Sequence, residues 1–391
     1  MADGKKIGIL TGGGDVPGLN SVIKSVVYRG SEIGRSVIGI RRGWRGLTHL
    51  DPSDATDPTY IRALTRENTR AIDRTGGTVL HTSRTNPRRM PESKLPAHLS
   101  ADRLKRLSFD GKFYDFTPIV IENLETLGIG CLIAIGGDDT LSFASVLCAA
   151  GFPVIGIPKT MDNDVQNTEY CIGFSTAITR AKDAITRQRT TLGSHERVGI
   201  FRIFGRDAGF TAIYTAYVTS ARCLIPEYPF NLERAISLLM EDKRNNPSNY
   251  SVVVVSEGAV WEQRDVQETG AADAYGHRKK VDIGHALAHE IETRTGEETM
   301  ASDLTYDLRS GAPDAIDQIV ATTFANIAVD LIRDNISGRM IGIQEGRYAH
   351  TPLPPKPLGP RKVNIQKLYN TERYRPNYTS KLGEPLLFTG S

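Results

Sequence analysis

The sequence predicts an α/β protein of two lobes, each with a mainly parallel sheet covered by helices. Short, continuously apolar segments have the composition of strands that are buried on both faces. These segments are residues 7–10, 37–40, 131–135, 154–157, 200–203 and 252–255. Segments with helical periodicity, such as 19–28 and 141–150, alternate with them, as in parallel strands joined by helices. A chain of 391 residues is long for one compact core, which favours two lobes.

Two regions interrupt this alternation. Residues 86–118 are polar and basic and contain prolines, so we expect an insertion or mobile loop there, with one helix at about 101–107. From residue 351 the chain is first rich in proline and then polar with several tyrosines. We expect that this tail lies over the surface as irregular structure.

Composition argues against several classes of protein. The 48 basic residues are nearly balanced by 45 acidic ones, so we expect no binding to nucleic acid and no binding to membranes. We expect no signal peptide in the first ten residues, and we see no apolar segment of bilayer length. The four cysteines lack CxxC spacing, which favours free thiols in a reducing cytosol over disulfides or zinc ligands. A cytoplasmic location is therefore expected.

The segment TGGGDVPGLN, residues 11–20, joins a predicted strand to a predicted helix. Glycines there let backbone N–H groups approach a phosphate, and the N-terminus of the helix favours an anion. The segment is no dinucleotide fingerprint, because Pro17 stands at the third glycine position, and it is no Walker A loop. By itself, a tight strand-to-helix turn explains it equally well.

A second turn, GGDDT at residues 136–140, also joins a predicted strand to a helix. The adjacent carboxylates of Asp138 and Asp139 at such a turn indicate a divalent cation, with Mg²⁺ bridging phosphate oxygens. The alternative is helix capping, because acidic residues in the first turn suit the helix dipole. For this motif alone, capping is the safer interpretation.

A third turn, PKTMDNDV from residue 158, follows the predicted strand at 154–157. It brings together a cation on Lys159, a hydroxyl on Thr160 and the carboxylates of Asp162 and Asp164. A carboxylate within hydrogen-bond reach of a substrate hydroxyl accepts its proton during phosphoryl transfer. Asn and Asp also favour plain turns, but a plain turn rarely needs this whole set.

Arginines flank the next predicted strand, with Arg197 before it and Arg206 after it. Arg binds phosphate through two parallel hydrogen bonds, although a surface ion pair explains either residue alone. Glu257, Arg294 and the segment YDLRSG at 306–311 follow later in the chain. Each of these is unremarkable by itself.

Taken in order, these segments resemble the phosphofructokinase family. The set runs GGGD-PGLN, GGTV-L-SR, GGDDT, PKTMDNDV, SHER, FGR, SEG, ETR and Y-LRSG, within residues 6–347. An ordered set of this length is far more specific than any single motif. The resemblance implies a phosphofructokinase-like fold with the active site in the cleft between the lobes, and phosphoryl transfer to fructose 6-phosphate.

The resemblance also implies catalytic roles. Asp162 resembles the base that deprotonates the 1-hydroxyl of fructose 6-phosphate, and Thr160 and Asp164 flank it and position the sugar. Arg84 and Arg206 resemble cations that stabilise the transition state. In-line transfer through a loose transition state needs charge neutralisation more than covalent help, which suits such a set.

The same resemblance implies the binding residues. Asp138 resembles a ligand of Mg²⁺, and Arg197 resembles an arginine that reaches across a subunit interface. The implied donor-binding residues are Gly14, Asp139, Thr140 and Lys159. The implied residues for the sugar phosphate are Arg197, Gly205, Glu257, Arg294, Tyr306 and Arg309. A homodimer or homotetramer is expected.

Two positions indicate pyrophosphate as the phosphoryl donor. ATP-using members of the family carry Gly where this chain has Asp139, whose side chain would obstruct and repel the α-phosphate of a nucleotide. ATP-using bacterial members also carry Gly at the position of Lys159, and a Lys there meets the charge of a short polyphosphate. Lys159 is the weaker indication, because some ATP-using members share it. Tyr306 stands where ATP-using bacterial members have His, and Phe204 departs from the family's usual Met.

The expected reaction is reversible phosphoryl transfer from pyrophosphate to fructose 6-phosphate, giving fructose 1,6-bisphosphate and phosphate, in glycolysis and gluconeogenesis. The alternatives are an ATP-dependent member of the family and a non-catalytic regulatory subunit with the same fold. We expect residues 1–165 to form the donor lobe, 166–345 to form the sugar-phosphate lobe, and 346–391 to be an extension that packs on the surface.

Overall fold

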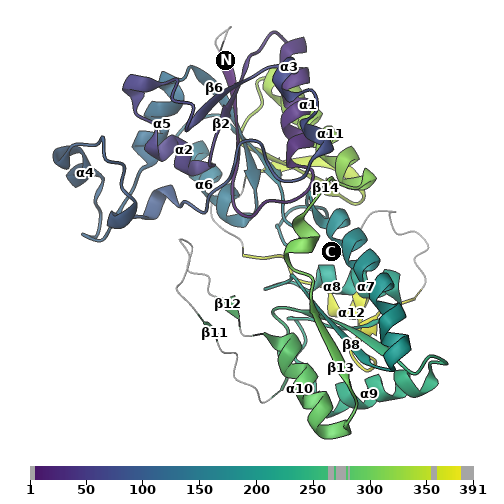
Figure 1. Ribbon diagram of the computed structural model, residues 1–391. Helices are drawn as coiled ribbons and strands as arrows, with labels where there is room; N and C mark the ends of the chain where they lie inside the picture. Colours follow the sequence, from purple (N-terminus) through teal and green to yellow (C-terminus); the bar gives the residue numbers. More distant parts are fainter. Residues whose placement is uncertain (1–4, 263–267, 270–278, 281, 354–358, 380–391) are drawn as a thin grey trace.

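The computed structural model describes residues 5–262, 268–269, 279–280, 282–353 and 359–379. The chain forms two lobes, one above the other in Figure 1, and each is built around one main sheet. In this part of the chain the larger sheet has the strand order β15-β14-β7-β6-β1-β2-β3, and the smaller one β13-β8-β10-β9. The predicted α/β class, with mainly parallel sheets covered by helices, is confirmed.

The first sheet is parallel except at its two edges, where β3 and β15 run antiparallel to their neighbours. Its strands are β1 (Lys6–Thr11), β2 (Val37–Ile40), β3 (Ile61–Leu64), β6 (Ile129–Gly136), β7 (Val154–Pro158), β14 (Arg339–Gln344) and β15 (Arg347–Pro352). β6 and β7 are buried along their whole length, which explains why their sequence is continuously apolar. The four strands predicted in this half of the chain are present.

The second sheet is parallel throughout its described strands. These are β8 (Val198–Ile203), β9 (Arg222–Leu224), β10 (Ser251–Ser256) and β13 (Thr299–Asp303). The sequence predicted β8 and β10 but not the two outer strands. β9 is only three residues long and β13 reads TMASD, so neither has a continuously apolar sequence.

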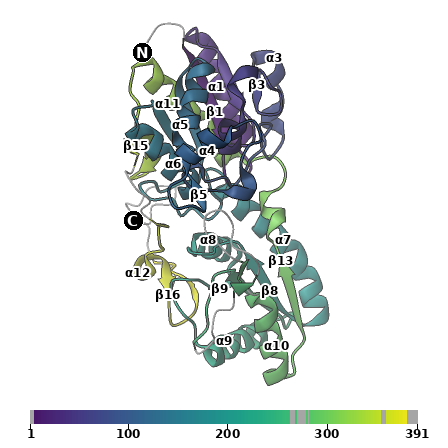
Figure 2. The same cartoon turned by 90° about the vertical axis from the view of Figure 1, so that its left-hand side faces the viewer.

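Helices cover both sheets (Figures 1 and 2). The longer ones are α1 (Leu19–Glu32), α5 (Thr117–Thr126), α6 (Asp138–Ala149), α7 (Phe174–His195), α8 (Phe210–Thr219), α9 (Leu232–Asn245), α10 (Ile283–Thr295) and α11 (Ala315–Arg333). The shorter ones are α2 (Trp44–His49), α3 (Arg66–Thr69), α4 (Ala101–Leu107), α12 (Ile365–Leu368) and the 3-10 turn η5 (Tyr306–Arg309). The predicted helix at 101–107 is α4.

The division of the chain into lobes differs from the predicted one. Residues 166–345 were assigned to the second lobe, but β14 pairs with β7 of the first sheet and β15 pairs with β14. The chain therefore returns to the first lobe after η5. Residues 347–352 are a strand of the first sheet and not part of a surface extension. Pairing between segments far apart in the chain decides this boundary, and local sequence does not record it.

Two large apolar cores stabilise the lobes. One fills the face of the first sheet under α1 and α11 and continues through α7 into the second lobe, as shown by shared members such as Ile9, Phe324 and Phe201. The other lies on the opposite face under α2, α5 and α6, around Trp44 and Phe143. The first core crosses between the lobes, so they are packed together through buried apolar side chains.

The predicted insertion and tail are more ordered than a surface loop. Residues 86–118 enclose a small core of Met90, Leu107 and Phe116 and contain the hairpin of β4 (Met90–Pro91) and β5 (Phe113–Tyr114). The tail forms α12 and a second hairpin, β16 (Tyr369–Asn370) with β17 (Arg375–Pro376). Tyr369 and Tyr374 are buried. The expectation of irregular structure is therefore wrong for this part of the tail.

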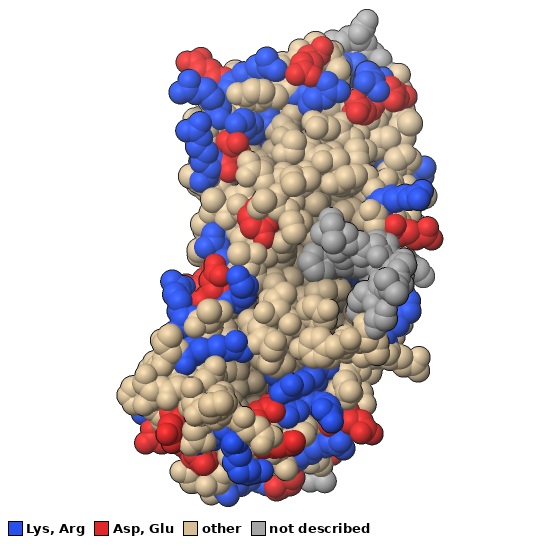
Figure 3. Space-filling model, turned by 90° about the vertical axis from the view of Figure 1, so that its right-hand side faces the viewer, with Lys and Arg blue, Asp and Glu red and all other residues tan. Residues whose placement is uncertain are grey.

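Charges of both signs are interspersed on the face of the molecule shown in Figure 3. Among the described residues, α11 alone is long and apolar enough to cross a bilayer by length and composition. Half of it is buried inside the protein, and it joins the core under the first sheet together with α1. Its apolar sequence is thus that of a core helix.

Candidate active site

The carboxyl ends of three neighbouring strands meet at one edge of the first sheet. β1, β6 and β7 are parallel neighbours, so the turns that follow them lie side by side, where ligands bind in open α/β sheets. We call residues 12–15 the glycine turn, 137–140 the aspartate turn and 159–164 the carboxylate turn. The three motifs singled out in the sequence therefore gather at one place.

The glycine turn is closely approached by side chains of neighbouring segments at Gly12 and Gly14. A Cβ on Gly14 would lie 2.0 Å from Nη1 of Arg309, and a Cβ on Gly12 would lie 2.5 Å from Oγ1 of Thr140. Thr140 is buried and packs the glycine turn against the aspartate turn. Thr82 Oγ1 donates a hydrogen bond to the Gly13 carbonyl at 2.6 Å, so residues 82–84, including Arg84, lie beside the turn.

Lys159 is a buried cation between the glycine and carboxylate turns. Its Nζ donates to the Gly14 carbonyl at 2.5 Å, and 3% of its surface is exposed. Burial, assisted by the positive charges of Arg309 and Arg84, lowers the pKa of Lys159 to about 7. A buried ammonium group therefore lies directly against the glycine turn.

Asp162 and Asp164 are half-buried carboxylates on the carboxylate turn. Burial, and then the charges of Asp164 and Glu257, raise the pKa of Asp162 well above its usual range, against the opposing effect of Arg309 and other cations. Oδ1 of Asp162 is shielded from solvent and has no hydrogen-bond partner in the described part of the chain. Burial also raises the pKa of Asp164 to about 6. A buried carboxylate oxygen of this kind can accept a hydrogen bond from a ligand.

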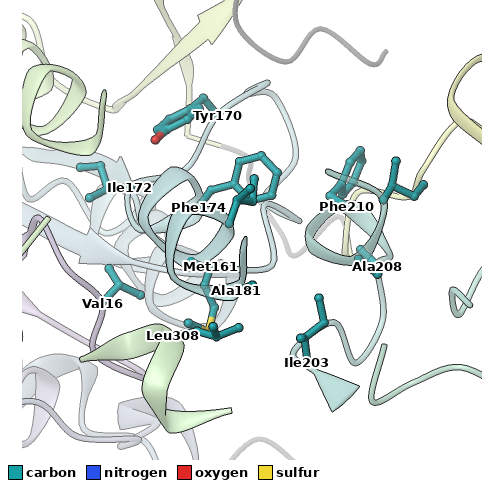
Figure 4. Close-up of a cluster of buried hydrophobic side chains, with 14 of the residues drawn as sticks. Val16, Met161, Tyr170, Ile172, Phe174, Ala181, Ile203, Ala208, Phe210 and Leu308 are labelled. Atoms are coloured by element: carbon teal, nitrogen blue, oxygen red, sulfur yellow. The ribbon is translucent and has the colours of Figure 1, made fainter. Parts of the chain in front are cut away.

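Thr160 fixes the backbone of this turn, because its Oγ1 accepts a hydrogen bond from the Asp162 N–H at 3.2 Å. Met161, in the same turn, is buried in the apolar cluster that also contains Leu308 and Phe210 (Figure 4). Its carbonyl accepts a hydrogen bond from Thr211 Oγ1 on α8 at 2.8 Å. Polar and apolar contacts thus hold the backbone of the carboxylate turn in place.

The aspartate turn begins α6, with Asp138 and Asp139 in the first turn of the helix, where their charges suit the helix dipole. The N-cap residue is Gly137, and no side chain makes a capping hydrogen bond there. Burial raises the pKa of Asp138, and its charge in turn raises the pKa of Asp164, so the two carboxylates lie near each other. Among the described residues, no three His, Cys, Asp or Glu side chains gather into a metal site. Mg²⁺ commonly binds only one or two carboxylates together with substrate phosphates, and Asp138 fits that pattern.

The second lobe contributes two arginines to the same place. Arg309 is the last residue of η5, and its guanidinium stacks on the ring of Phe204 with 4.4 Å between the guanidinium carbon and the ring centroid. Arg206 follows β8, and its Nε donates to Asp207 at 2.8 Å. Both positive charges lower the pKa of Asp162. Cations from the second lobe therefore face the carboxylates of the first.

Gly205, Glu257 and Tyr306 lie around these arginines. Gly205 has φ of 125°, and a Cβ there would lie 2.7 Å from the Ala208 carbonyl, so only glycine fits this turn. Glu257 follows β10, and its charge raises the pKa of Asp162. Tyr306 is 75% exposed, and its ring meets Phe204 edge to face at 6.4 Å.

Two predicted site residues lie elsewhere in this chain. Arg197 precedes β8 and pairs with Glu298 at 2.7 Å, at the end of the strand opposite to Arg206. Six residues of extended chain separate the two ends by about 20 Å. Arg294 lies in the last turn of α10 and pairs with Glu290 at 2.8 Å and with Glu233 of α9. One chain therefore does not bring Arg197 or Arg294 to Asp162.

Arg361 also lies at the site, but local sequence does not indicate it, because it belongs to no motif and lies in the tail. Its guanidinium donates to the carbonyl of Asn163 at 2.8 Å, directly between the two carboxylates of the turn. Glu227 accepts hydrogen bonds from the N–H groups of Gly209 and Val363, both at 3.0 Å. It thus attaches the tail beside Arg361.

Comparisons with known proteins agree with this arrangement. A family model described as "Phosphofructokinase" matches residues 6–332. The "Pyrophosphate--fructose 6-phosphate 1-phosphotransferase" of Streptomyces coelicolor is 38% identical over 352 residues, which is 89% of this chain and 93% of that protein. The protein of the same name from Amycolatopsis methanolica is 37% identical over 87% of this chain and 90% of its own length. The "ATP-dependent 6-phosphofructokinase 2" of Streptomyces coelicolor is 35% identical over 89% and 93%.

Solved structures share the fold. The structure titled as a pyrophosphate-dependent phosphofructokinase from Nitrosospira multiformis aligns with a TM-score of 0.76 over 99% of this chain and 92% of that chain, at 16% identity. That from Marinobacter aquaeolei aligns with a TM-score of 0.72 over 99% and 92%, at 20% identity. At these identities the likeness concerns the arrangement of the two lobes.

Proposed function

The chain belongs to the phosphofructokinase family, and on this premise we propose that it transfers a phosphoryl group reversibly from pyrophosphate to the 1-hydroxyl of fructose 6-phosphate. The products are fructose 1,6-bisphosphate and phosphate, and the reaction serves glycolysis and gluconeogenesis in the cytoplasm. One observation carries the proposal for the site. The shielded Oδ1 of Asp162, unpartnered within the described residues, lies among a glycine turn, a buried lysine and arginines of the second lobe.

Asp162 is the proposed general base. Its oxygen accepts the proton of the sugar 1-hydroxyl as the oxygen of that hydroxyl attacks the phosphoryl group. The raised pKa makes this carboxylate a stronger base than an exposed Asp, because burial favours its protonated form. Thr160 and Asp164 position the base and the sugar from the same turn.

Positive charge from both lobes would stabilise the transition state. A loose phosphoryl-transfer transition state spreads negative charge over the transferred oxygens, and fixed cations there lower the barrier. The proposed cations are Lys159 and Arg84 on the first lobe and Arg206 and Arg309 on the second. Their origin on separate elements means that the site is complete only when the lobes hold the donor and the sugar between them.

Mg²⁺ is the proposed cofactor, held by Asp138 together with donor oxygens. When bound it supplies charge neutralisation at the phosphoryl donor. The half-buried Asp138 at the start of α6 is the described residue best placed to hold it. Glu257, Gly205 and Tyr306 are proposed to line the sugar site.

Pyrophosphate is proposed as donor over ATP for two reasons. Asp139 stands in the first turn of α6, where its charge would repel the α-phosphate of a nucleotide, and Lys159 places a buried cation against the glycine turn. Relatives named for pyrophosphate reach 38% identity. Because an ATP-dependent relative reaches 35%, ATP is the second candidate donor. A regulatory subunit is disfavoured by the intact base, metal ligand and cations.

The test is a donor comparison with purified protein. Fructose 6-phosphate and Mg²⁺ are supplied with either pyrophosphate or ATP, and fructose 1,6-bisphosphate is measured. Product with pyrophosphate alone is expected. Product with ATP alone would keep the family and reject the argument from Asp139 and Lys159. Product with neither would favour another sugar phosphate as the acceptor, or a regulatory subunit.

A homodimer or homotetramer is proposed as the active form. Arg197 and Arg294 lie at the amino end of the second sheet, on the opposite side from Arg206. The family resemblance nevertheless implies that both bind the sugar phosphate. The position of the two arginines and the implied role are compatible if each arginine completes the site of a neighbouring subunit.

A further inference from the structure

The C-terminal segment 359–379 connects the carboxylate turn to the second lobe. It lies beyond the residues matched by the family model, which end at 332. Residues 369–374 of the segment are anchored in the second lobe. Tyr369 Oη donates to the Cys223 carbonyl at 2.8 Å, and the Cys223 N–H donates to the Tyr374 carbonyl at 2.8 Å. Residue 361, near the start of the segment, reaches the turn that follows β7 of the first lobe. The segment therefore bridges elements that belong to different sheets.

Arg361 makes the contact with the carboxylate turn. Its backbone N–H donates to the Asp164 carbonyl at 2.6 Å. In its side chain, Nη2 donates to the Asn163 carbonyl at 2.8 Å, and Nε lies 3.3 Å from the same oxygen. Nη2 also lies 3.3 Å from the Glu169 carbonyl, and the guanidinium stacks on Phe210 with 4.3 Å to the ring centroid. The guanidinium is thus held at its edge by carbonyls and at its face by an aromatic ring.

The carbonyl that Arg361 binds belongs to a constrained residue. Asn163 has φ of 54°, in the left-handed region, and its side chain is also fully engaged. Nδ2 of Asn163 donates to the Glu169 carbonyl at 2.9 Å, and Oδ1 accepts from the Cys171 N–H at 2.8 Å. Asn163 stands between the two carboxylates of the turn, so the direction of its peptide sets the direction of both. Leaving this buried carbonyl without its donor would favour a rotated turn.

We propose that Arg361 is a positioning residue that holds the carboxylate turn in its productive orientation, and that the segment 359–379 thereby couples the second lobe to the catalytic turn. This inference rests on the proposed function, because it assigns Asp162 the role of base. Arg361 itself does not touch the reacting atoms. Its loss therefore lowers turnover while the binding of pyrophosphate and sugar phosphate is retained. A misplacement of about 1 Å in such a turn costs roughly a hundredfold in rate.

The matched control is Arg375, a second half-buried arginine of the same tail. Its Nη2 donates to Asp242 on α9 at 2.8 Å. This contact lies within the second lobe and does not involve the carboxylate turn. Arg375→Ala removes a guanidinium and an ion pair from the tail but leaves the contacts of Arg361 in place. Any effect that both variants share therefore reflects the stability of the tail, and any effect confined to Arg361 reflects the turn.

The test compares Arg361→Ala, Arg361→Lys and Arg375→Ala with the wild type, using whichever donor the wild type accepts. For Arg361→Ala we expect kcat to fall about 10- to 100-fold, both KM values to change less than about threefold, and millimolar guanidinium chloride to restore part of kcat. Arg361→Lys keeps one donor for the Asn163 carbonyl and should recover part of the rate. Arg375→Ala should keep the kcat of the wild type.

Hydrogen exchange gives a readout that does not depend on activity. The peptide covering 159–172 should exchange faster in Arg361→Ala than in Arg375→Ala, at equal thermal stability or after correction for it. Equal kcat and equal exchange in Arg361→Ala and the wild type would overturn the proposal. An equal loss in Arg361→Ala and Arg375→Ala would overturn it as well. If the wild type itself is inactive with every donor, the proposed function fails, and the exchange experiment still decides whether Arg361 holds the turn.

Discussion

Among single residues, the buried charges of the site determine how the protein responds to mutation and pH. Asp162 and Lys159 are both shifted towards their neutral forms by burial, the carboxylate upward and the ammonium downward in pKa. Each group is therefore kept at a cost in folding free energy. Such strained ionisation is typical of sites in which activity and stability oppose each other.

Replacement of the proposed base should separate activity from stability. Asp162→Asn removes the proton acceptor, so we expect kcat to fall by about 10² to 10⁴, with little change in either KM. The same variant should unfold at a higher temperature at neutral pH. The folded-state pKa is raised, so the folded protein loses stability as the pH rises from the ordinary Asp pKa towards the raised value. Asn cannot ionise and avoids this loss.

Steady-state kinetics and thermal unfolding check this expectation. Asp334→Asn is the control, because Asp334 is an exposed residue that pairs with Arg333 at the surface. It should leave both kcat and the unfolding temperature nearly unchanged. Turnover of Asp162→Asn within tenfold of the wild type would remove Asp162 from the role of base.

Lys159 should set an alkaline limit on the use of pyrophosphate. Its pKa is lowered to about 7, so the free enzyme loses this positive charge as the pH rises through that value. We expect kcat/KM for pyrophosphate to fall above about pH 7, by up to tenfold per unit, because this parameter reports ionisations of the free enzyme. Lys159→Arg stays charged at every pH tested, so its kcat/KM for pyrophosphate should not fall in this way above pH 7. The same fall in both proteins would show that another group, or the substrate, causes it.

Among elements, the junction of α7 and α11 depends on one carboxylate. Asp317, near the start of α11, is fully buried. It accepts hydrogen bonds from Tyr170 Oη at 2.6 Å, from the N–H groups of Gly173 and Thr176 at 2.8 Å, and from Thr176 Oγ1 at 2.5 Å. α7 follows the carboxylate turn and α11 leads to β14. This carboxylate therefore holds together the two segments that connect the lobes.

Asp317→Ala should destabilise the fold far more than an exposed Asp→Ala change on the same helix. It leaves several buried donors unsatisfied, and we expect a loss of about 3 kcal/mol in the free energy of unfolding. Asp330→Ala, which removes the surface ion pairs with Arg29 and Arg333, should cost no more than about 1 kcal/mol. Equilibrium denaturation measures both. Similar losses in the two variants would show that the network contributes little.

At the scale of the whole molecule, the amino and carboxyl ends of the second sheet carry different charged residues. The carboxyl end presents Arg206 and Glu257 to the carboxylate turn, whereas the amino end carries Arg197, paired with Glu298. A residue about 20 Å from the site along a rigid strand contributes only if a second copy brings it there. If Arg197 binds the sugar phosphate, as the resemblance implies, the proposed oligomer is needed to complete that site.

Mixing two inactive variants tests this arrangement. Asp162→Asn and Arg197→Ala should each be nearly inactive alone. If Arg197 acts in a neighbouring subunit, a hybrid dimer of the two variants contains one site with both residues intact. Co-expressed variants should therefore regain a substantial fraction of wild-type activity. Activity of the mixture equal to the sum of the separate variants would show that Arg197 works within its own subunit or not at all.

The sequence by itself determined the fold class, and it predicted most of the residues that the structure brings together at the candidate site. Strands that are buried on both faces are continuously apolar, so the sequence pattern predicted β1, β6, β7, β8 and β10. The turns after them carry glycines and carboxylates at short, regular spacing, and such a local pattern is visible in the sequence without the fold. Asp162, Lys159 and Asp138 stand in such turns, and local motifs are therefore enough to identify them.

Only the tertiary structure decided which segments share a lobe and what supports the site. β14 and β15 join the first sheet through pairing with β7, and β13 joins the second although its sequence TMASD has no strand pattern. Arg361 reaches Asn163 across about 200 residues of chain, through contacts that no local spacing encodes. A turn that is built from neighbouring residues has a recognisable local sequence. Contacts between distant segments depend instead on how the whole chain packs, and no local sequence pattern specifies them.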